Sequence, residues 1–169
     1  MTRGLLNDPE RYIQSHWSQY KDVWFHGDYV MVDDDGLWYM YGRVDDVINV
    51  SGHRLSTVEI EQAVITHKKI ADAAAISIPD EITGNAIALF VVLKDKADQK
   101  TIQPEMEEFI SEKIGKIAKP KTVLVISDMP KTRTGKVMRR LLRAKLLGED
   151  IGDTSALENP HVLDEIKRI

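Results

Sequence analysis

The amino-acid sequence predicts an α+β fold, in which helices cover a small mixed or antiparallel sheet and a helix and a β-hairpin precede that sheet. After Asp45, segments with strand and helix patterns follow in the order strand, helix, strand, strand, helix, strand, helix. Two apolar runs, 71–78 and 85–93, have the length and composition of central strands. The chain has 169 residues, of which 43% are hydrophobic, and this is enough for one core of ordinary size.

The segment before Asp45 is predicted to contain one helix and one hairpin. At 7–10, Asn-Asp-Pro-Glu combines capping residues, a proline and an acid, which is typical of a helix start. Residues 23–41 are rich in strand formers and are interrupted by Asp-Asp-Asp-Gly at 33–36, which predicts a hairpin turn. This front segment is too small for a core of its own, so we expect it to be the end of a larger domain.

The elements after Asp45 follow from local patterns. Residues 47–50 form a short strand, and Ser56 with Glu59 gives a capping box for a helix that ends near Lys69. The later segments are a helix, a strand and a helix at 103–117, 121–126 and 135–147. Beyond Gly148 the sequence becomes acidic and loses its periodicity. Residues 150–169 are therefore predicted to be a tail that packs elsewhere or stays loose.

Composition excludes several classes of function. The chain has no cysteine, so it can contain no disulfide framework, zinc–thiolate site or cysteine nucleophile. Its net charge is −4, and its basic surface is local, around residues 113–145. Both observations argue against nucleic acid as a partner. The apolar stretch 86–93 is far shorter than the roughly 20 residues of a membrane helix, and no leader pattern opens the sequence. We expect no membrane partner and a cytoplasmic location.

One basic segment stands out as a candidate for binding anions. Lys136 follows a Thr-Gly pair, and seven Lys or Arg with no Asp or Glu lie between 131 and 145. Gly135 can adopt positive φ and lets the backbone approach a ligand closely. A phosphate-binding P-loop would need a Gly where Pro130 stands and a Ser or Thr where Val137 stands, so Lys136 is no Walker lysine. The simpler interpretation, a solvated basic helix, stays open on this segment alone.

Three motifs in order carry a family resemblance: Phe-His-Gly-Asp at 25–28, a longer run at 42–61 that begins Gly-Arg-Val-Asp-Asp, and Pro-Lys-Thr-Arg-Thr-Gly-Lys-Val-Met-Arg-Arg at 130–140. The chain resembles the adenylate-forming enzymes, most closely the branch of AMP-forming acetyl-CoA and short-chain acyl-CoA synthetases. The resemblance covers residues 1–147 and only the C-terminal part of such enzymes. It implies a two-domain ligase whose large N-terminal domain, with the acyl pocket and the ATP loop, is a partner of this chain.

The resemblance implies a division into three parts. Residues 1–44 would end the large domain, 45–147 would form the C-terminal lid domain, and 148–169 would be the acidic tail. Asp45 would be the hinge about which the lid swings between two half-reactions. From the residues alone, Asp45 is equally well an ordinary turn residue.

The resemblance also implies roles in binding ATP or the adenylate. The Asp28 carboxylate would accept hydrogen bonds from both ribose hydroxyls, which suits an ionised acid facing a diol. Arg43 would contact phosphate or ribose, although a salt bridge with Asp45 or Asp46 is the alternative. Arg54 would bind a phosphate of the nucleotide or of CoA. Lys136 would be the catalytic residue, bridging the carboxylate and the α-phosphate during adenylation.

The same resemblance implies a CoA site and a metal site. Ser51 and Gly52 would lie beside the pantetheine arm, since Gly52 allows close approach. Where relatives have an arginine that touches CoA, this sequence has Ser111-Glu112-Lys113, so Lys113 or Lys116 would hold the CoA phosphate. His67, with the backbones of Ile65 and Ile70, corresponds to a place where some relatives hold Mg²⁺. His53 receives no role.

The implied reaction converts acetate, ATP and CoA into acetyl-CoA, AMP and pyrophosphate through an acetyl-adenylate. Two alternatives share all three motifs: a synthetase for propionate or another short-chain acid, and an adenylating enzyme that loads a carrier-protein thiol. A third alternative is a non-enzymatic module whose basic helix, 136–145, binds an acidic partner or nucleic acid. In the family, acetylation of the catalytic lysine is a known form of control, which implies an acetyltransferase and a deacetylase as further partners.

Overall fold

The computed structural model describes residues 3–95 and 99–169, without the side chains of Asp45, Gln99 and Lys100, and divides into two units, 1–45 and 46–169. In the first unit, α1 (Pro9–His16) begins where Asp8 accepts a hydrogen bond from the Arg11 N–H at 3.2 Å. Strands β1 (Asp28–Val32) and β2 (Trp38–Arg43) pair antiparallel. Their turn is closed by Asp33, whose Oδ1 accepts from Leu37 N–H at 2.9 Å. The predicted helix and hairpin are thus confirmed.

The first unit has almost no buried apolar side chain among its described residues. Tyr12 is its one member of the buried hydrophobic set, whereas Trp38 and Met40 of the hairpin are 70% and 60% exposed. A two-stranded ribbon with both faces open has little stability by itself. This agrees with the prediction that the segment is too small for its own core.

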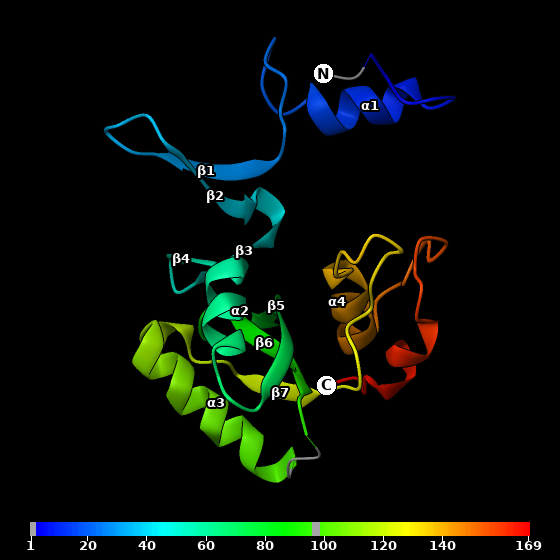
Figure 1. Cartoon of the computed structure of the whole chain (residues 1–169). Coiled ribbons are helices and arrows are strands. Elements are labelled where there is room, and N and C mark those ends of the chain that lie inside the picture. The colour runs from blue at the N-terminus through cyan, green and yellow to red at the C-terminus, as the bar shows by residue number, and fades with distance from the viewer. Residues whose placement is uncertain (1–2, 96–98) are drawn as a thin grey trace. The chain divides into compact units, whose positions relative to one another are not determined.

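The second unit is built on a mixed sheet of three strands (Figure 1). Strand β6 (Gly84–Leu93) lies in the centre, antiparallel to β5 (Ile70–Asp80) and parallel to β7 (Thr122–Val125). A second antiparallel pair joins β3 (Val47–Val50) to β4 (His53–Ser56). The predicted α+β class and its mixed sheet are confirmed.

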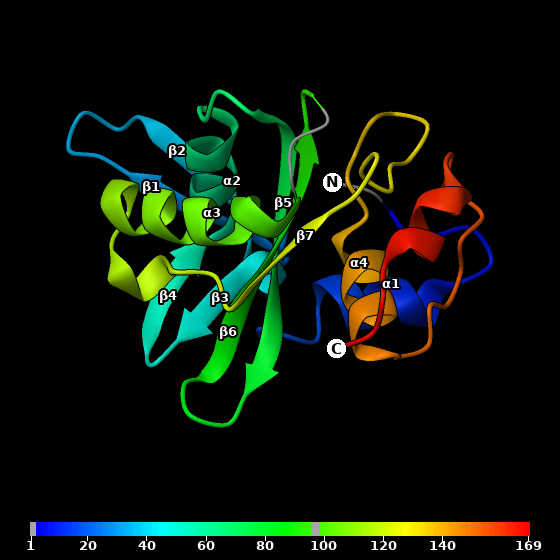
Figure 2. The ribbon, with the colours of Figure 1, turned by 90° about the horizontal axis from the view of Figure 1, so that it is seen from below.

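Helices cover both faces of the three-stranded sheet (Figure 2). One face packs on α2 (Thr57–Ile65), α3 (Gln99–Lys113) and the β3–β4 pair, through alternate residues such as Ala75 and Leu89. The other face packs on α4 (Arg139–Leu147) and the C-terminal segment, through residues such as Ile76 and Phe90. Burial on both faces explains why these strands read as continuous apolar runs.

Several predicted boundaries are wrong by a few residues. Helix α2 ends at Ile65 and not near Lys69, although its capping box is present, with Ser56 Oγ accepting from the Glu59 N–H at 3.4 Å. Helix α3 begins at Gln99 and holds Pro104 inside it. Helix α4 begins at Arg139 and not at residue 135, because residues 131–137 form a bridge of their own. Strand β4 lies between the predicted strand at 47–50 and the predicted helix, where the sequence predicted no strand.

The C-terminal segment is packed against the second unit. A short 3₁₀ helix, Pro160–Glu165, follows Asn159, and Val162, Leu163 and Ile166 are buried in the core beneath α4. Of the two expectations for residues 150–169, packing is therefore correct. Within the described residues, no helix combines the length and the apolar composition that crossing a membrane requires.

Candidate functional site

Lys136 lies on a miniature hairpin formed by residues 130–138. Lys131 and Val137 form an antiparallel bridge, and Met138 N–H donates to the Pro130 carbonyl at 2.8 Å. The backbone of Lys136 makes two hydrogen bonds with Thr132. The Lys136 N–H donates to Thr132 Oγ1 at 3.1 Å, and the Lys136 carbonyl accepts from the Thr132 N–H at 2.9 Å. The turn needs Gly135, whose φ is +81°. The backbone of Lys136 is thus fixed by hydrogen bonds.

The side chain of Lys136 is exposed and has no carboxylate partner within the described ranges 3–95 and 99–169. Nearby basic residues differ in this respect. Lys131 pairs with Asp72 at 2.8 Å, and Arg139 pairs with Glu61 at 2.6 Å. An ammonium held on an ordered turn and left without an internal partner is available to an external anion.

Ser51 and Gly52 form the two-residue turn between β3 and β4. Their φ angles are +49° and +85°, which gives a hairpin turn with positive φ at both central positions. Ser51 N–H donates to the Thr83 carbonyl at 3.1 Å, so this turn is tied to the β5–β6 turn. A Cβ on Gly52 would meet no atom within 4 Å, which leaves open space beside the backbone.

A groove of about 360 Å³ lies next to this turn and is lined by Val50 and Thr83, among other residues. Its basic lining consists of Lys116, Lys119 and Lys121. Lys119 pairs with Glu107 at 2.9 Å and Lys121 pairs with Asp80 at 2.7 Å. The predicted Lys113 does not line this groove.

Lys113 lies in the last turn of α3, where its Nζ is 5.8 Å from the centre of the Phe109 ring. Lys116 makes no ion pair with another described residue. Of the two lysines considered for the CoA phosphate, Lys116 is therefore better placed beside the turn of Ser51 and Gly52 than Lys113.

Asp28 and Arg43 are brought together in the first unit. They are directly opposite in the β1–β2 register, although 15 positions separate them in the sequence. The Arg43 guanidinium lies over Gly27, where an added Cβ would come within 3.2 Å of Nη2. Asp28 forms an ion pair with the ring of His26, and its side chain is 20% exposed. A carboxylate and a guanidinium at one strand end could together bind a sugar diol and a phosphate.

Arg54 and Asp45 are the other predicted nucleotide and hinge residues. Arg54 is exposed on β4, opposite Asn49, while its neighbour Leu55 points into the core. Asp45 lies within a 3₁₀ turn, Val44–Asp46, at the boundary of the two units, and its side chain lies outside the described residues.

Arg139 forms an ion-pair network that sequence reasoning missed. Its guanidinium makes two hydrogen bonds with the buried Glu61 of α2, at 2.9 and 2.6 Å, and lies 3.6 Å from Asp46. Burial alone would lower the pKa of Arg139, but the interactions with Glu61 and then with Asp46 outweigh it, so the pKa of Arg139 is raised. The network connects the start of α4 with the residue that follows Asp45. Glu61 on the apolar face of α2 could have indicated this network, because a buried carboxylate needs a cationic partner.

His67 and its neighbours were predicted to hold Mg²⁺. The His67 ring is largely buried, with Nδ1 accepting from Lys69 N–H at 3.4 Å and Nε2 lying 3.4 Å from Glu105 Oε1. Both ring nitrogens are thus engaged, which leaves backbone oxygens as the donors a hard cation would prefer. Within the described residues there is no cluster of three His, Asp or Glu side chains suited to a metal ion.

Residues 59–136 match the AMP-binding enzyme C-terminal domain family. This segment is an AMP-binding enzyme C-terminal domain. Acetyl-coenzyme A synthetase 1 of Candida albicans is 47% identical to the chain over 172 residues, which are 98% of the chain and 26% of that protein. The acetyl-coenzyme A synthetase of Methanothrix thermoacetophila is 40% identical over 174 residues, with 100% and 26% covered.

Solved structures with the same domain agree with this family. A crystal structure of the ATP-bound RpMatB-BxBclM chimera B1 has a TM-score of 0.71 and 25% identity, over 83% of this chain and 28% of that one. The anthranilate CoA ligase AuaEII, solved with anthranoyl-AMP, has a TM-score of 0.64 and 28% identity, over 77% and 24%. The chain spans about a quarter of the length of the curated relatives it matches, and corresponds to their C-terminal portion.

Proposed function

We propose that this chain is the C-terminal lid of an AMP-forming acetate–CoA ligase. In the first half-reaction the acetate oxygen attacks the α-phosphate of ATP, giving acetyl-AMP and releasing pyrophosphate. In the second, the CoA thiol attacks the acetyl carbon and AMP leaves. The similarity to acetyl-coenzyme A synthetases at 40–47% identity over almost the whole chain supports acetate as the acid.

One observation carries this proposal. The hairpin of Lys136 continues into α4, whereas the turn of Ser51 and Gly52 belongs to the β3–β4 pair, and these elements pack on opposite faces of one sheet. A rigid unit with two functional segments on opposite faces can offer them to one active site only in turn. Two successive half-reactions with different demands fit such an arrangement.

In adenylation, the chain's residues supply charge and position. Lys136 would place its ammonium between the acetate oxygen and the α-phosphate, where negative charge develops as pyrophosphate leaves. Asp28 would hold the ribose hydroxyls, and Arg43 would bind phosphate or ribose oxygens. Arg54 lies on β4 with the turn of Ser51 and Gly52, so it would bind a phosphate of the nucleotide or of CoA when that turn faces the active site. Holding the reacting groups in the correct geometry lowers the barrier as well, because the reactants no longer have to meet by random encounter.

In thioester formation, the turn of Ser51 and Gly52 would take over. The open space beside Gly52 suits the thin pantetheine arm, and Lys116, with Lys113 as the less favourably placed candidate, would bind a CoA phosphate. Asp45 would be the hinge between residues 1–44, which end the N-terminal domain, and the lid 45–147 with its tail 148–169. The division of the chain into units at Asp45 and Asp46 supports this assignment.

Further parts of the proposal rest on the family. Mg²⁺ would be held by backbone oxygens of Ile65, His67 and Ile70, where it would stabilise the end of α2. The exposed ammonium of Lys136 would be the target of a lysine acetyltransferase and a deacetylase, since acetylation removes its charge. The large N-terminal domain would be the partner that holds ATP and acetate. The cytoplasm is the proposed location.

The alternative of a basic binding helix finds less support. Arg139 is paired with Glu61, and Arg140 donates to the carbonyl oxygens of Ile151 and Asp153. Arg143 donates to the Ser77 carbonyl at 2.7 Å, and Lys145 lies 3.6 Å from Asp164. These basic side chains form hydrogen bonds and ion pairs within the second unit, so α4 offers little free charge to an acidic partner or to nucleic acid.

A crossed pair of variants in the full-length enzyme tests the proposal. Lys136→Ala is expected to slow acetate-dependent exchange of pyrophosphate into ATP by on the order of a hundredfold or more, while pre-made acetyl-AMP still reacts with CoA. Gly52→Leu is expected to do the reverse, because its side chain would fill the space beside the turn. Gly36→Leu is the control, since Gly36 has a similar φ of +80° and equally open space at another hairpin tip. Equal losses in both half-reactions for either test variant would refute the proposal.

A further inference from the structure

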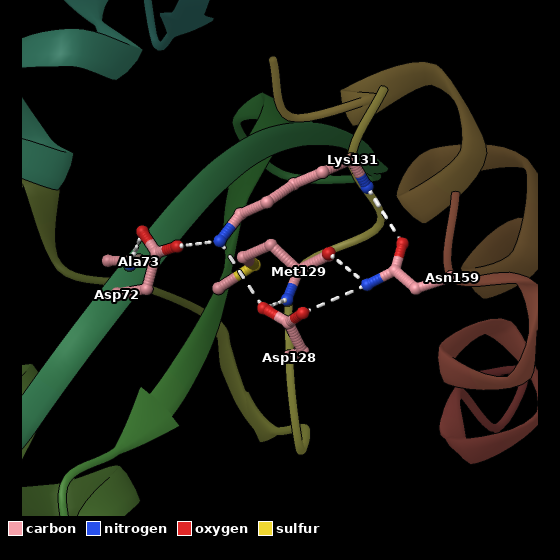
Figure 3. Close-up of polar contacts among 6 residues, drawn as sticks. All are labelled: Asp72, Ala73, Asp128, Met129, Lys131 and Asn159. Carbon is pink, nitrogen blue, oxygen red and sulfur yellow. Dashed lines mark hydrogen bonds and ion pairs between the residues drawn. The ribbon is translucent and has the colours of Figure 1, made fainter. Parts of the chain in front are cut away.

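The hairpin of Lys136 is fastened to the C-terminal segment by Asn159 (Figure 3). The Asn159 side chain makes hydrogen bonds in both directions: Oδ1 accepts from the Lys131 N–H at 3.0 Å, and Nδ2 donates to Asp128 Oδ2 at 3.0 Å and to the Met129 carbonyl at 2.8 Å. One amide therefore holds the chain on both sides of Pro130, where the hairpin begins. A polar side chain whose hydrogen bonds are all satisfied in this way rigidifies the segments that it joins.

Further contacts extend the attachment along the first limb of the hairpin. Glu158 N–H donates to the Lys131 carbonyl at 3.0 Å, and Thr132 forms an antiparallel bridge with Leu157. Thr132 is the residue that binds the backbone of Lys136 through both its main chain and its hydroxyl. Lys136 is thus connected to the C-terminal segment through a single residue.

Lys131 adds a contact to the sheet. Its Nζ lies 2.8 Å from Asp72 Oδ2 of β5 and 3.3 Å from Asp128 Oδ1. The hydrogen bond with Asp72 is the largest reason that the pKa of Lys131 is raised. As Figure 3 shows, Lys131 reaches toward Asp72 with its side chain while its backbone faces Asn159. The hairpin is therefore held between β5 and the C-terminal segment.

The C-terminal segment is itself well anchored, so it can serve as a fixed support. Val162, Leu163 and Ile166 are buried beneath α4, and Ser127 donates from its N–H and hydroxyl to Glu165. The support and the hairpin meet at Asn159.

We propose that Asn159 is a positioning residue for adenylation: by fixing the hairpin 130–138 to the C-terminal segment, it sets the place from which Lys136 reaches the reacting oxygens. This rests on the proposed role of Lys136. Asn159 touches no substrate itself. A displacement of about 1 Å at a reacting group can cost on the order of a hundredfold in rate, so loss of the attachment should be visible in kinetics.

An isosteric change provides the test in the full-length enzyme. Asn159→Asp keeps the acceptor for Lys131 but places a carboxylate oxygen against Asp128 Oδ2 and the Met129 carbonyl, so both donated bonds become repulsions. Adenylation is expected to slow by about 10-fold to 100-fold. The reaction of pre-made acetyl-AMP with CoA is expected to change by less than about twofold, because Lys136 acts only in the first half-reaction.

A second substitution is expected to rescue the first in part. In the double variant Asp128→Asn with Asn159→Asp, the new amide at 128 can donate to the new carboxylate at 159 while its oxygen still accepts from the Met129 N–H. This removes the repulsion at position 128 and leaves the one against the Met129 carbonyl, so adenylation should recover part of its loss, by about threefold or more relative to Asn159→Asp. Hydrogen exchange of the Thr132, Lys136 and Met138 amides should be faster in Asn159→Asp and slower than that in the double variant.

Asn85→Asp is the matched control, since Asn85 also bonds through its amide, donating to the Asn49 carbonyl at 3.2 Å in the same unit. It should leave adenylation and the exchange of the hairpin amides unchanged. Unchanged adenylation in Asn159→Asp, equal loss in both half-reactions, or no rescue by Asp128→Asn would each overturn the inference. If Lys136→Ala instead leaves adenylation intact, the proposed function fails and not merely this attachment.

Discussion

Arg139 and Glu61 are 78 positions apart in the sequence and form a two-pronged ion pair in the structure, with Nε–Oε1 and Nη2–Oε2 distances of 2.9 and 2.6 Å. Glu61 is 8% exposed and also accepts from the Ala75 N–H at 2.9 Å. The carboxylate thereby joins α2, β5 and α4. Because α2 and α4 belong to different faces of the sheet, this pair connects the two halves of the core.

Removing the cation should therefore destabilise the chain. Arg139→Met leaves Glu61 largely buried without its partner, and the free energy of unfolding is expected to fall by about 3 kcal/mol. Urea denaturation measures this change. Arg133→Met is the control, because Arg133 is exposed and should contribute less than about 0.5 kcal/mol. Similar values for the two variants would contradict a structural role for the pair.

Lys136→Arg tests whether charge alone is sufficient. The wide planar guanidinium cannot take the place of a compact ammonium between two oxygens, so adenylation should fall almost as far as in Lys136→Ala, by on the order of a hundredfold or more. Single-turnover formation of acetyl-AMP in the full-length enzyme is the measurement. Near-normal activity of the Arg variant would mean that Lys136 acts only through long-range charge.

Asp45→Pro tests the proposed hinge. Proline fixes φ near about −65°, so the variant should favour one orientation of the second unit and keep one half-reaction while losing most of the other. Asp45→Ala, which leaves the backbone free to rotate, should retain both. The hinge assignment fails if the proline variant affects both half-reactions alike or neither.

The 169-residue chain by itself should form no acetyl-adenylate. It corresponds to about a quarter of the length of its relatives, and the residues proposed to hold triphosphate and acid lie in the partner domain. Incubation with acetate, ATP and Mg²⁺, followed by a sensitive assay for pyrophosphate, is the experiment. Steady pyrophosphate release by the pure chain would contradict the proposal that adenylation requires the N-terminal domain.

The β5–β6 turn gives a prediction for pH. The hydrogen bond from Lys121, followed by those from Thr83, lowers the pKa of Asp80 below its ordinary value of 3.8. A carboxyl group with a lowered pKa stabilises the fold above its ordinary pKa and loses this contribution as the pH falls below it. Asp80→Asn should therefore flatten the decline in unfolding free energy below about pH 4. If the unfolding free energy of Asp80→Asn depends on acid pH as that of the wild type does, Asp80 does not make the expected contribution.

Local chemistry explains which elements could be predicted from the sequence. The Ser56 capping box, the turn at 33–36 and the apolar runs of β5 and β6 each contain their own signal within a few residues. Strand β4 contains no such signal, because His53 and Arg54 are exposed and only Leu55 reaches the core. Its pairing with β3 depends on the turn at Ser51 and Gly52.

The candidate site shows the same division between local and distant information. Asp28, Arg43 and Lys136 stand in recognisable motifs, and their roles as site residues remain predictions. Asn159 could not be found in this way, because its contacts reach 28 to 31 positions back along the chain. The Asn-Pro pair at 159 and 160 marks the start of a helical turn, but it does not reveal what the Asn side chain binds.

The central position of β6 has a consequence for how the chain reaches its fold. Its eight consecutive apolar residues, 86–93, obtain their second pairing edge only from β7, which follows α3 in the sequence. Until that parallel crossover closes, an uncharged strand edge without proline stays open to other chains. We expect the yield on refolding from denaturant to fall as protein concentration rises, since intermolecular association competes with β7 for that edge.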